Sequence, residues 1–235
     1  MKAMVLAAGL GTRLGPLTAD RPKALVEVDG RPLIDHVLGR LAEAGFSEVI
    51  VNLHHFADQV EAWLKTHDSG LAVAISREEV LLDTGGGLKK AAWFFAGEKH
   101  FLIHNVDVLS DIDLGDLYRS HHSGGPLATL AVMRRKASRY LLIDEAGRVC
   151  GRRRGEDGAP DLRRAAEGPL EAVGFCGIQI GTAELLERLP PVGRYSITDV
   201  YLDLIGEGAD IRAAFVDGSR WRDCGRPEDL DSWED

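Results

Sequence analysis

The sequence predicts an α/β fold in which a mostly parallel sheet carries helices on both faces and a smaller β-rich half follows. In residues 1–110, short apolar runs alternate with segments whose apolar residues recur every three or four positions. This β-α-β-α rhythm is typical of a parallel sheet covered by helices. After about residue 111 the rhythm changes to short strand-like runs separated by turn residues. We therefore expect a single domain over 1–235, with an N-terminal half over about 1–110 and a C-terminal half over about 111–235.

The elements of the N-terminal half follow from periodicity and from turn residues. Continuous apolar runs indicate buried parallel strands, and helical spacing of apolar residues indicates helices. The expected elements are a strand over 1–8, a glycine- and proline-rich loop over 9–28, a helix over 34–41 that Gly45 stops, a strand over 48–53, a helix around 60–64, a strand over 71–76, a helix over 84–95 and a strand over 100–108.

The C-terminal half is predicted to be richer in strands. Glu145-Ala-Gly147 is a turn signal that would join two strands as a hairpin, and 155–169 mixes Gly, Pro and charge without periodicity, which indicates a surface loop. The expected elements are strands over 127–133, 139–143, 148–152, 171–180 and 211–216, and helices over 183–189 and 198–205.

Composition excludes several classes of protein. Lys and Arg number 28 against 37 Asp and Glu, giving a net charge of −9, which disfavours a binder of nucleic acid or of anionic membrane surfaces. No run of about 20 apolar residues could span a bilayer, and the N-terminal apolar run is too short for a signal peptide. The three cysteines have no spacing typical of a disulfide framework or a zinc cluster. We expect a cytoplasmic protein that binds neither nucleic acid nor membrane.

The loop after the first strand has the composition of a phosphate-binding turn. Gly9 and Gly11 would let backbone N–H groups approach an anion, and Arg13 and Lys23 add two cations; alternatively, the glycines only turn the chain. A dinucleotide-binding fingerprint would need a third glycine where Leu14 stands, and the Gly-Lys-Ser/Thr ending of a P-loop is absent.

The sequence Leu6-Ala-Ala-Gly-Leu-Gly-Thr-Arg-Leu-Gly-Pro-Leu-Thr18, followed by Arg21-Pro-Lys-Ala-Leu25, resembles the signature of sugar-1-phosphate nucleotidyltransferases. Similarity to the family extends over essentially the whole chain and is strongest to its short, single-domain members. The resemblance implies a Rossmann-like fold of the nucleotide-diphospho-sugar transferase type, with a nucleotide-binding N-terminal half and a sugar-binding C-terminal half.

The resemblance also implies the catalytic and metal-binding residues. Asp107 closes a strand-like run, and Asp223 lies in Trp221-Arg-Asp-Cys-Gly-Arg-Pro-Glu228; alone, a strand-end aspartate is as readily a loop cap. Both positions match family aspartates that hold Mg²⁺, although Val106 replaces the usual glycine beside Asp107. Arg13, Lys23 and Asp107 are then catalytic. The implied nucleotide-binding set is Leu6, Ala8, Gly9, Gly11, Thr12, Arg13, Lys23, Asn52, Glu79, Asp83, Gly86 and Asn105.

Sugar recognition is implied less completely. Gly174-Phe-Cys-Gly-Ile178 resembles the family strand that lines the hexose pocket, and Glu171 is a candidate acceptor for a sugar hydroxyl. Ser196-Ile-Thr-Asp199 resembles the family's helix start near the same pocket but would serve equally well as an ordinary helix N-cap. Many relatives carry Glu-Lys-Pro, whose lysine binds the sugar phosphate, whereas this chain has Glu167-Gly-Pro169. Arg152, Arg153 and Arg154 are nearby in sequence, and which cation meets the sugar phosphate stays open.

The expected reaction is the transfer of a nucleoside monophosphate from a nucleoside triphosphate to a sugar 1-phosphate, with release of pyrophosphate. The resemblance leaves two substrate pairs open, UTP with N-acetylmuramate 1-phosphate and GTP with mannose or heptose 1-phosphate. It leaves the oligomeric state open as well. The alternatives are an inactive nucleotide-sugar-binding protein of the same fold and, less favoured by the loop sequence, an NAD-dependent oxidoreductase.

Overall fold

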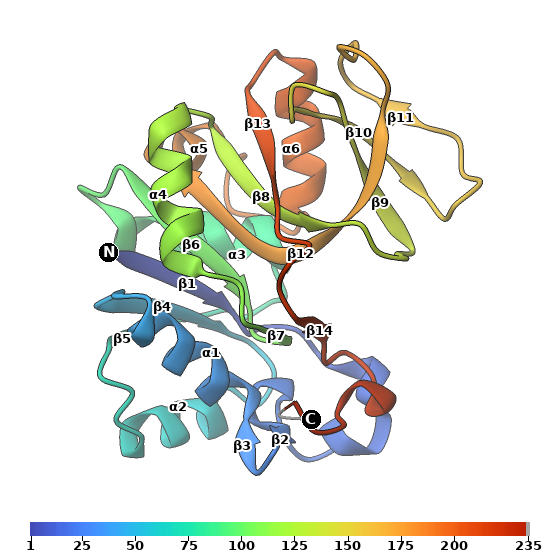
Figure 1. Ribbon diagram of the computed structural model, residues 1–235. Coiled ribbons are helices and arrows are strands. Elements are labelled where there is room, and N and C mark those ends of the chain that lie inside the picture. Colours follow the sequence, from blue (N-terminus) through green and yellow to red (C-terminus); the bar gives the residue numbers. More distant parts are fainter. Residues whose placement is uncertain (234–235) are drawn as a thin grey trace.

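A mixed sheet of ten strands runs through the whole molecule (Figure 1). The computed structural model describes residues 1–233, without the side chains of residues 123 and 124, so residues 234–235 of the expected C-terminal half lie outside the described residues. The strand order is β11-β10-β9-β12-β6-β1-β4-β5, and β8 joins the sheet by pairing with both β12 and β13.

The N-terminal half supplies four parallel strands, which confirms the predicted parallel sheet. Strand β1 pairs with β4 on one side and with β6 on the other, and β4 pairs with β5. The bounds are Lys2–Leu6 for β1, Glu48–Leu53 for β4, Ala72–Arg77 for β5 and His100–Asn105 for β6.

Helices cover both faces of this parallel part, as predicted, because successive side chains of a strand point to opposite faces. Met4 packs in one apolar cluster with side chains of α3, α5 and α6, whereas Ala3 and Val5 pack in a second cluster with side chains of α1, α2 and α4. The α-helices are α1 (Leu33–Glu43), α2 (Ala57–Thr66), α3 (Asp83–Ala91), α4 (Leu114–Gly124), α5 (Ala183–Arg188) and α6 (Ile197–Gly206).

The C-terminal half is mainly antiparallel and is joined to the first half by the long strand β12. Residues 178–182 of β12 pair with β6, and residues 171–173 pair with β9. Between them, β12 has a bulge at which Gly177 has a φ of +74°. The remaining strands are β8 (Ala128–Met133), β9 (Arg139–Ile143), β10 (Val149–Arg154), β11 (Asp161–Leu162), β12 (Glu171–Thr182) and β13 (Ile211–Phe215).

Short elements complete the fold around the end of β1. Two small two-stranded sheets are formed by β2 (Glu27–Val28) with β3 (Arg31–Pro32) and by β7 (Val108–Ser110) with β14 (Trp221–Asp223). Four 3₁₀ segments are η1 (Thr12–Thr18), η2 (Lys23–Leu25), η3 (Ala92–Phe95) and η4 (Pro227–Asp229). In Figure 1, β14 returns the end of the chain to the centre of the molecule, beside β7.

Three sequence-based expectations about elements were wrong. Helix α4 was missed, and the expected loop over 155–169 contains β11, whose two residues pair with β10. The strand expected over 100–108 ends at Asn105, which is the last residue of β6 to pair with β1. The chain turns at Val106 and Asp107 and then pairs with β14 as β7, so Asp107 lies in a turn.

Candidate functional site

The site begins at the carboxyl ends of three neighbouring parallel strands. Leu6 of β1 is paired with Asn52 of β4 on one side and with Asn105 of β6 on the other. The Asn52 Oδ1 accepts a hydrogen bond of 2.8 Å from the backbone N–H of Ala7, directly after β1. Ligands of open α/β sheets bind in the crevice beyond the carboxyl ends of the strands, and these three residues line a cavity at that edge.

The glycine loop forms the next wall of the cavity, and its shape depends on Gly11. This residue has a φ of +67°, in the left-handed region that favours glycine. A Cβ atom at position 11 would lie 2.9 Å from Thr18 Cγ2 and 3.1 Å from Lys23 Cβ. The absence of a side chain at Gly11 therefore lets the Thr18 and Lys23 segments close onto the loop.

Lys23 forms an ion pair with Asp107. Its Nζ donates a hydrogen bond to the Asp107 Oδ2, and the lysine side chain is only 8% exposed. The carboxylate belongs to the turn between β6 and β7, and the lysine belongs to η2. The fold therefore brings a buried cation to the carboxylate in the turn after β6.

Asp223 is brought to the same place by the pairing of β14 with β7. Asp223 is the register partner of Val108, and the Cys224 N–H donates a 2.7 Å hydrogen bond to the carbonyl of Asp107. Burial raises the pKa of Asp223, and the Asp107 carboxylate raises it further, whereas Lys23 and Arg13 oppose the rise. The Arg13 Nη1 lies 3.8 Å from the Asp223 Oδ2.

The two carboxylates fit a Mg²⁺ site. The Asp223 Oδ1 is buried without a hydrogen-bond partner among the described residues, so it is an oxygen available to a cation. Within the described part of the chain no group of three or more His, Cys, Asp or Glu residues is arranged to hold a metal ion. Mg²⁺ is commonly held by one or two carboxylates together with substrate phosphates and water, and Asp107 and Asp223 match that pattern.

The first cavity has a volume of about 360 Å³ and collects most of the predicted nucleotide-binding residues. Those that line it are Leu6, Ala8, Gly9, Gly11, Thr12, Arg13, Lys23, Asn52, Asp83 and Asn105, and Asp107, predicted as a catalytic and metal-binding residue, lines it as well. The lining residues absent from the predicted set are Leu10, Leu81, Thr84, Val106 and Gly225. Val106 is 4% exposed and packs in the core as well.

Glu79 and Gly86 lie outside the lining of this cavity. A Cβ at Gly86 would lie 1.8 Å from the carbonyl oxygen of Gly193, so this glycine serves the packing of α3 against the segment before α6. Glu79 is exposed, whereas its neighbour Glu78 is buried. Glu78 accepts hydrogen bonds from Asn52 Nδ2 (2.7 Å) and from the Leu82 N–H (2.9 Å), and so positions Asn52 beside the cavity.

Sequence reasoning missed Glu78, because two adjacent glutamates give no periodic signal that tells which one is buried. It also left Gly225 out of the predicted site residues, although the residue lies within the quoted C-terminal motif. A Cβ at Gly225 would lie 2.7 Å from Asp223 Oδ1 and 2.5 Å from an Arg13 guanidinium nitrogen. The glycine therefore leaves room for the Arg13 and Asp223 side chains to meet.

A second cavity of about 280 Å³ lies in the C-terminal half and includes Asp223 in its lining. The other lining residues are Arg135, Ala137, Ser138, Arg139, Tyr140, Leu141, Arg152, Phe175 and Thr198. Asp223 lines this second cavity, whereas its neighbours Gly225 and Asp107 line the first. The segment around Asp223 therefore lies between the two cavities. Sequence reasoning did not single out Arg135 or Arg139, which belong to no recognised motif.

The three residues predicted to bind sugar lie around this second cavity but do not line it. Asp199 forms an ion pair with Arg152, which does line it. Glu171 pairs instead with Arg134, at 2.6 Å between Oε1 and Nε. A Cβ at Gly174 would lie 2.8 Å from the Cζ of Arg135, so Gly174 makes room for the Arg135 guanidinium.

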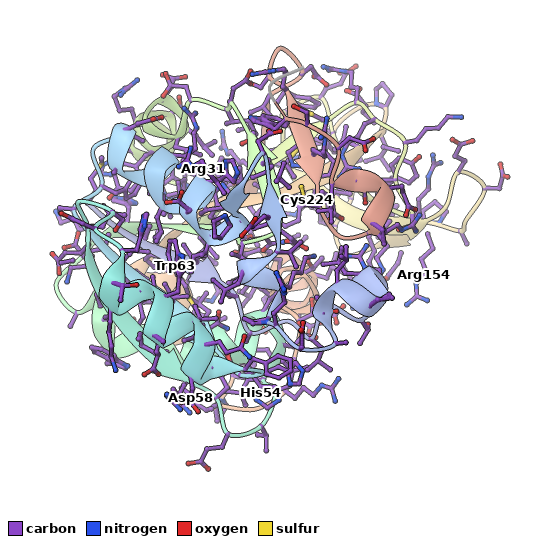
Figure 2. The ribbon with its side chains drawn as sticks, turned by 90° about the horizontal axis from the view of Figure 1, so that it is seen from below. Arg31, His54, Asp58, Trp63, Arg154 and Cys224 are labelled. Carbon is purple, nitrogen blue, oxygen red and sulfur yellow. The ribbon has the colours of Figure 1, made fainter. Side chains whose placement is uncertain are left out.

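The structure also explains why no lysine follows Glu167. Gly168 has a φ of +79°, and a Cβ there would lie 2.6 Å from the side chain of Glu145, so any side chain at position 168 would be strained. The Glu167 carboxylate forms a 2.8 Å ion pair with Arg148. Of the arginines at 152–154, Arg152 alone lines the second cavity, whereas Figure 2 shows Arg154 at the edge of the molecule.

Comparisons with known proteins indicate the family of the chain. A model of the family described as nucleotidyl transferase matches residues 2–152. The chain is 55% identical over 109 residues, 45% of each chain, to an N-acetylmuramate alpha-1-phosphate uridylyltransferase of Caulobacter vibrioides. It is 31% identical over 233 residues, 97% of this chain and 62% of the relative, to a mannose-1-phosphate guanylyltransferase of Mycobacterium tuberculosis.

The fold is shared with solved structures. The crystal structure of HddC from Yersinia pseudotuberculosis superposes with a TM-score of 0.78 at 23% identity, over 97% of this chain and 95% of that chain. The matches to the two curated relatives span 45% and 62% of their lengths. No helix among residues 1–233 is long and apolar enough to cross a membrane. With the family model matching well over half of the sequence, the protein belongs to the nucleotidyl transferase family, and its curated relatives are sugar-1-phosphate nucleotidyltransferases.

Proposed function

We propose that the protein transfers a nucleoside monophosphate from a nucleoside triphosphate to a sugar 1-phosphate. The observation that carries the proposal is the meeting of Lys23, Asp107 and Asp223 beside the glycine loop, between two cavities. The first cavity offers backbone and cations to a triphosphate, and the second offers space for another substrate next to Asp223. We call the place where Lys23, Asp107 and Asp223 meet, between the two cavities, the junction. A non-catalytic binding protein would not need a buried lysine and two carboxylates there.

In this reaction an oxygen of the sugar 1-phosphate attacks the α-phosphorus, forming a new O–P bond. The bond from the α-phosphorus to the bridging oxygen breaks, and pyrophosphate leaves with that electron pair. No covalent intermediate with the protein is needed, so catalysis consists of positioning the two substrates and stabilising the charge that develops.

Different residues of the chain would position the substrates and stabilise the developing charge. Backbone N–H groups around Gly9, Gly11 and Thr12 would hold the triphosphate, as glycine loops hold anions. The Arg13 guanidinium would stabilise the departing pyrophosphate, and Lys23 would position phosphate oxygens next to Asp107. Asp107 and Asp223 would hold Mg²⁺, which would supply charge neutralisation for the phosphates when bound.

The nucleoside would lie over the ends of β1 and β4. Asn52 and Asp83 line the cavity there, and Glu78 holds the Asn52 amide in place. Asp83 has a φ of +61°, and its own carboxylate accepts a 2.6 Å hydrogen bond from the Thr84 N–H. UTP with N-acetylmuramate 1-phosphate and GTP with mannose or heptose 1-phosphate are the substrate pairs we propose. The relatives' names include the N-acetylmuramate and mannose activities.

The test is a matrix of the four common nucleoside triphosphates against a panel of sugar 1-phosphates, scored by pyrophosphate release in the presence of Mg²⁺. We expect one or a few combinations to release pyrophosphate together with an equal amount of nucleotide-sugar. Absence of pyrophosphate from every combination, with a folded protein, would refute the proposal. Pyrophosphate without nucleotide-sugar would instead indicate a triphosphate hydrolase.

A further inference from the structure

A buried hydrogen-bond network connects two walls of the first cavity. One wall is the glycine loop, which the chain enters through Ala7 after β1. The other is the segment 81–84 at the start of α3, which we call the nucleoside wall. The network between them is made by the side chains of Asn52, near the end of β4, and Glu78, directly after β5.

Three hydrogen bonds run through these two side chains in sequence. The Ala7 N–H donates a hydrogen bond of 2.8 Å to Asn52 Oδ1, and Asn52 Nδ2 donates one of 2.7 Å to Glu78 Oε1. The second oxygen of this carboxylate, Oε2, accepts a hydrogen bond of 2.9 Å from the Leu82 N–H. The residue that enters the glycine loop is therefore linked to the nucleoside wall by an unbroken series of donors and acceptors.

The network is enclosed on all of its backbone sides. Asn52 is 2% exposed and Glu78 is 4% exposed, and a Cβ at Gly87 of α3 would lie 2.6 Å from both Asn52 Nδ2 and Glu78 Oε1. The Glu78 N–H donates a 2.7 Å hydrogen bond to the Leu53 carbonyl, and its own carbonyl accepts one of 2.9 Å from His54 Nδ1. A buried polar group that loses its partner is not rescued by water, so the network depends on every donor facing an acceptor.

We infer that Glu78 is a positioning residue for the triphosphate, which acts through Asn52 to fix the spacing between the glycine loop and the nucleoside wall. This inference rests on the proposed function, in which the glycine loop holds the phosphates and the nucleoside lies beside Asp83. Glu78 itself does not line the cavity. A nucleoside triphosphate has to meet both walls at once, whereas inorganic tripolyphosphate has to meet the glycine loop alone. Binding of the first ligand therefore depends on the network, and binding of the second does not.

Glu78→Gln breaks the network whichever way the new amide turns. With its oxygen toward Asn52, its NH₂ group faces the Leu82 N–H, and two donors meet. With its NH₂ group toward Asn52 the conflict lies there, and reversing the Asn52 amide only moves the conflict to the Ala7 N–H. Asn52→Asp breaks the network in another way, because two carboxylates then face each other.

The two substitutions combined restore the network with one hydrogen bond reversed. In Asn52→Asp/Glu78→Gln the carboxylate at position 52 accepts from the Ala7 N–H and from the amide at position 78, whose oxygen accepts from the Leu82 N–H. The charge and the size of the buried pair are unchanged. A hydrogen bond donated directly by the Asn52 amide to the nucleoside would not be restored, because a carboxylate has no proton to donate.

The test is calorimetric titration of the native protein, the two single variants and the double variant, in the presence of Mg²⁺. The ligands are inorganic tripolyphosphate and whichever of the four common nucleoside triphosphates the native protein binds most tightly. We expect each single variant to bind the nucleoside triphosphate about 10- to 100-fold more weakly, as one unsatisfied buried group would cause. Tripolyphosphate affinity should change by less than about threefold, and the double variant should recover nucleoside triphosphate affinity to within about threefold of the native value.

Steady-state kinetics provide a readout that loss of folding would not mimic. The single variants should raise the KM for the nucleoside triphosphate while kcat and the KM for the sugar 1-phosphate stay near their native values, because the junction is not altered. Glu187→Gln, the same chemical change at an exposed position of α5, is the matched control and should behave as the native protein does. If a single variant fails to fold, the double variant decides alone, since its native-like binding requires the restored network.

Two results would overturn the inference. Equal weakening of tripolyphosphate and nucleoside triphosphate binding in the single variants would show that the network serves the glycine loop alone. A double variant that binds the nucleoside triphosphate as weakly as the single variants would show that Asn52 acts by direct contact.

The same titrations separate failure of the inference from failure of the proposed function. Network-dependent binding of the nucleoside triphosphate, without pyrophosphate release with any sugar 1-phosphate, would support the inference and refute the activity. Pyrophosphate release together with native nucleoside triphosphate affinity in Glu78→Gln would refute the inference and leave the activity standing.

Discussion

The first cavity is lined at the carboxyl ends of strands β1, β4 and β6 and by the glycine loop, whereas the second is lined mainly by β9, β10 and the loop before β9. In the first, the shape depends on backbone: Gly11 has a positive φ and lets the segments of Thr18 and Lys23 approach the loop. In the second, the chemistry depends on long side chains, with Arg135 and Arg139 lacking carboxylate partners among the described residues.

In the proposed reaction, this difference would assign the two substrates to two kinds of binding surface. A triphosphate presents the same phosphates whatever its base, so a backbone loop with two cations serves every member of a family. The second substrate varies from one enzyme to another, and side chains on strand faces can change without disturbing the loop. The comparison therefore predicts that substitutions at the junction remove all activity, whereas substitutions in the second cavity change the choice of sugar.

The largest effect is expected for Asp107→Asn at the junction. The substitution keeps the size of the side chain but removes the charge that pairs with Lys23 and would hold Mg²⁺. We expect pyrophosphate release to fall by about 100- to 1,000-fold with every sugar, the range found when one group that stabilises developing charge is removed. Asp58→Asn, at an exposed position of α2 (Figure 2), is the control and should retain full activity. Unchanged turnover in Asp107→Asn would remove the junction from the mechanism.

Lys23→Ala is expected to lower turnover by about 100-fold. The lysine is buried against Asp107 and no other lysine lines the first cavity, so no neighbouring amine can replace it. Steady-state rates with saturating triphosphate measure the effect, and Lys65→Ala on the outer part of α2 serves as control. Full recovery of turnover at high triphosphate concentration would show that Lys23 contributes to ground-state binding alone.

Much of the first cavity could be predicted from the sequence because its residues lie in strand ends and in a glycine loop that have recognisable local patterns. Strand β4 has the bounds that its apolar run predicted, and the glycine loop, Lys23 and Asp107 stand together in the structure as the motif implied. The junction also depends on Asp223, whose position requires the pairing of β14 with β7. That pairing has no signal in a single sequence, and the resemblance to a family supplied it.

The second cavity could not be predicted, because a solvent-facing arginine and a ligand-facing one look the same in sequence. Arg139 and Arg152 belong to strands that were predicted, but their orientation depends on how β12 bends between β6 and β9. Helix α4 was missed for a different reason. Its buried residues Leu114, Leu117, Tyr118 and His121 have helical spacing, but polar residues interrupt them and one of the four is a histidine.

A smaller effect is expected from pH, and it concerns stability away from both cavities. His121 of α4 is 1% exposed, and burial, followed by the nearby His100 and His122, lowers its pKa to about 4. Well above pH 6.5 the group is neutral in both states and does not change stability. As the pH falls from about 6.5 to 4, the unfolded chain takes up a proton that the folded protein excludes, so stability is lost.

At pH 5 the loss from His121 should be about 2 kcal/mol relative to pH 7.5. Urea unfolding of the native protein and of His121→Gln at both pH values measures it, and the variant should lose less stability on acidification than the native protein does. His55→Gln, at an exposed position, is the control. An identical pH dependence in the native protein and His121→Gln would contradict the assignment.

The smallest effects on activity are expected from substituting two glycines, Gly11 of the first cavity and Gly174 beside the second. Gly11→Ala places a Cβ at a φ of +67° and 2.9 Å from Thr18 Cγ2, so it should lower the free energy of unfolding by about 1 to 2 kcal/mol. Gly174→Ala has no such strain, since its Cβ would meet the Arg135 side chain, which can move into the cavity. We expect it to raise the KM for the sugar 1-phosphate while leaving thermal unfolding nearly unchanged. Gly218→Ala, where a Cβ meets nothing within 4 Å, should change neither quantity. If Gly174→Ala were instead the less stable variant and Gly11→Ala the one with a raised sugar KM, backbone shape would govern the second cavity and side chains the first.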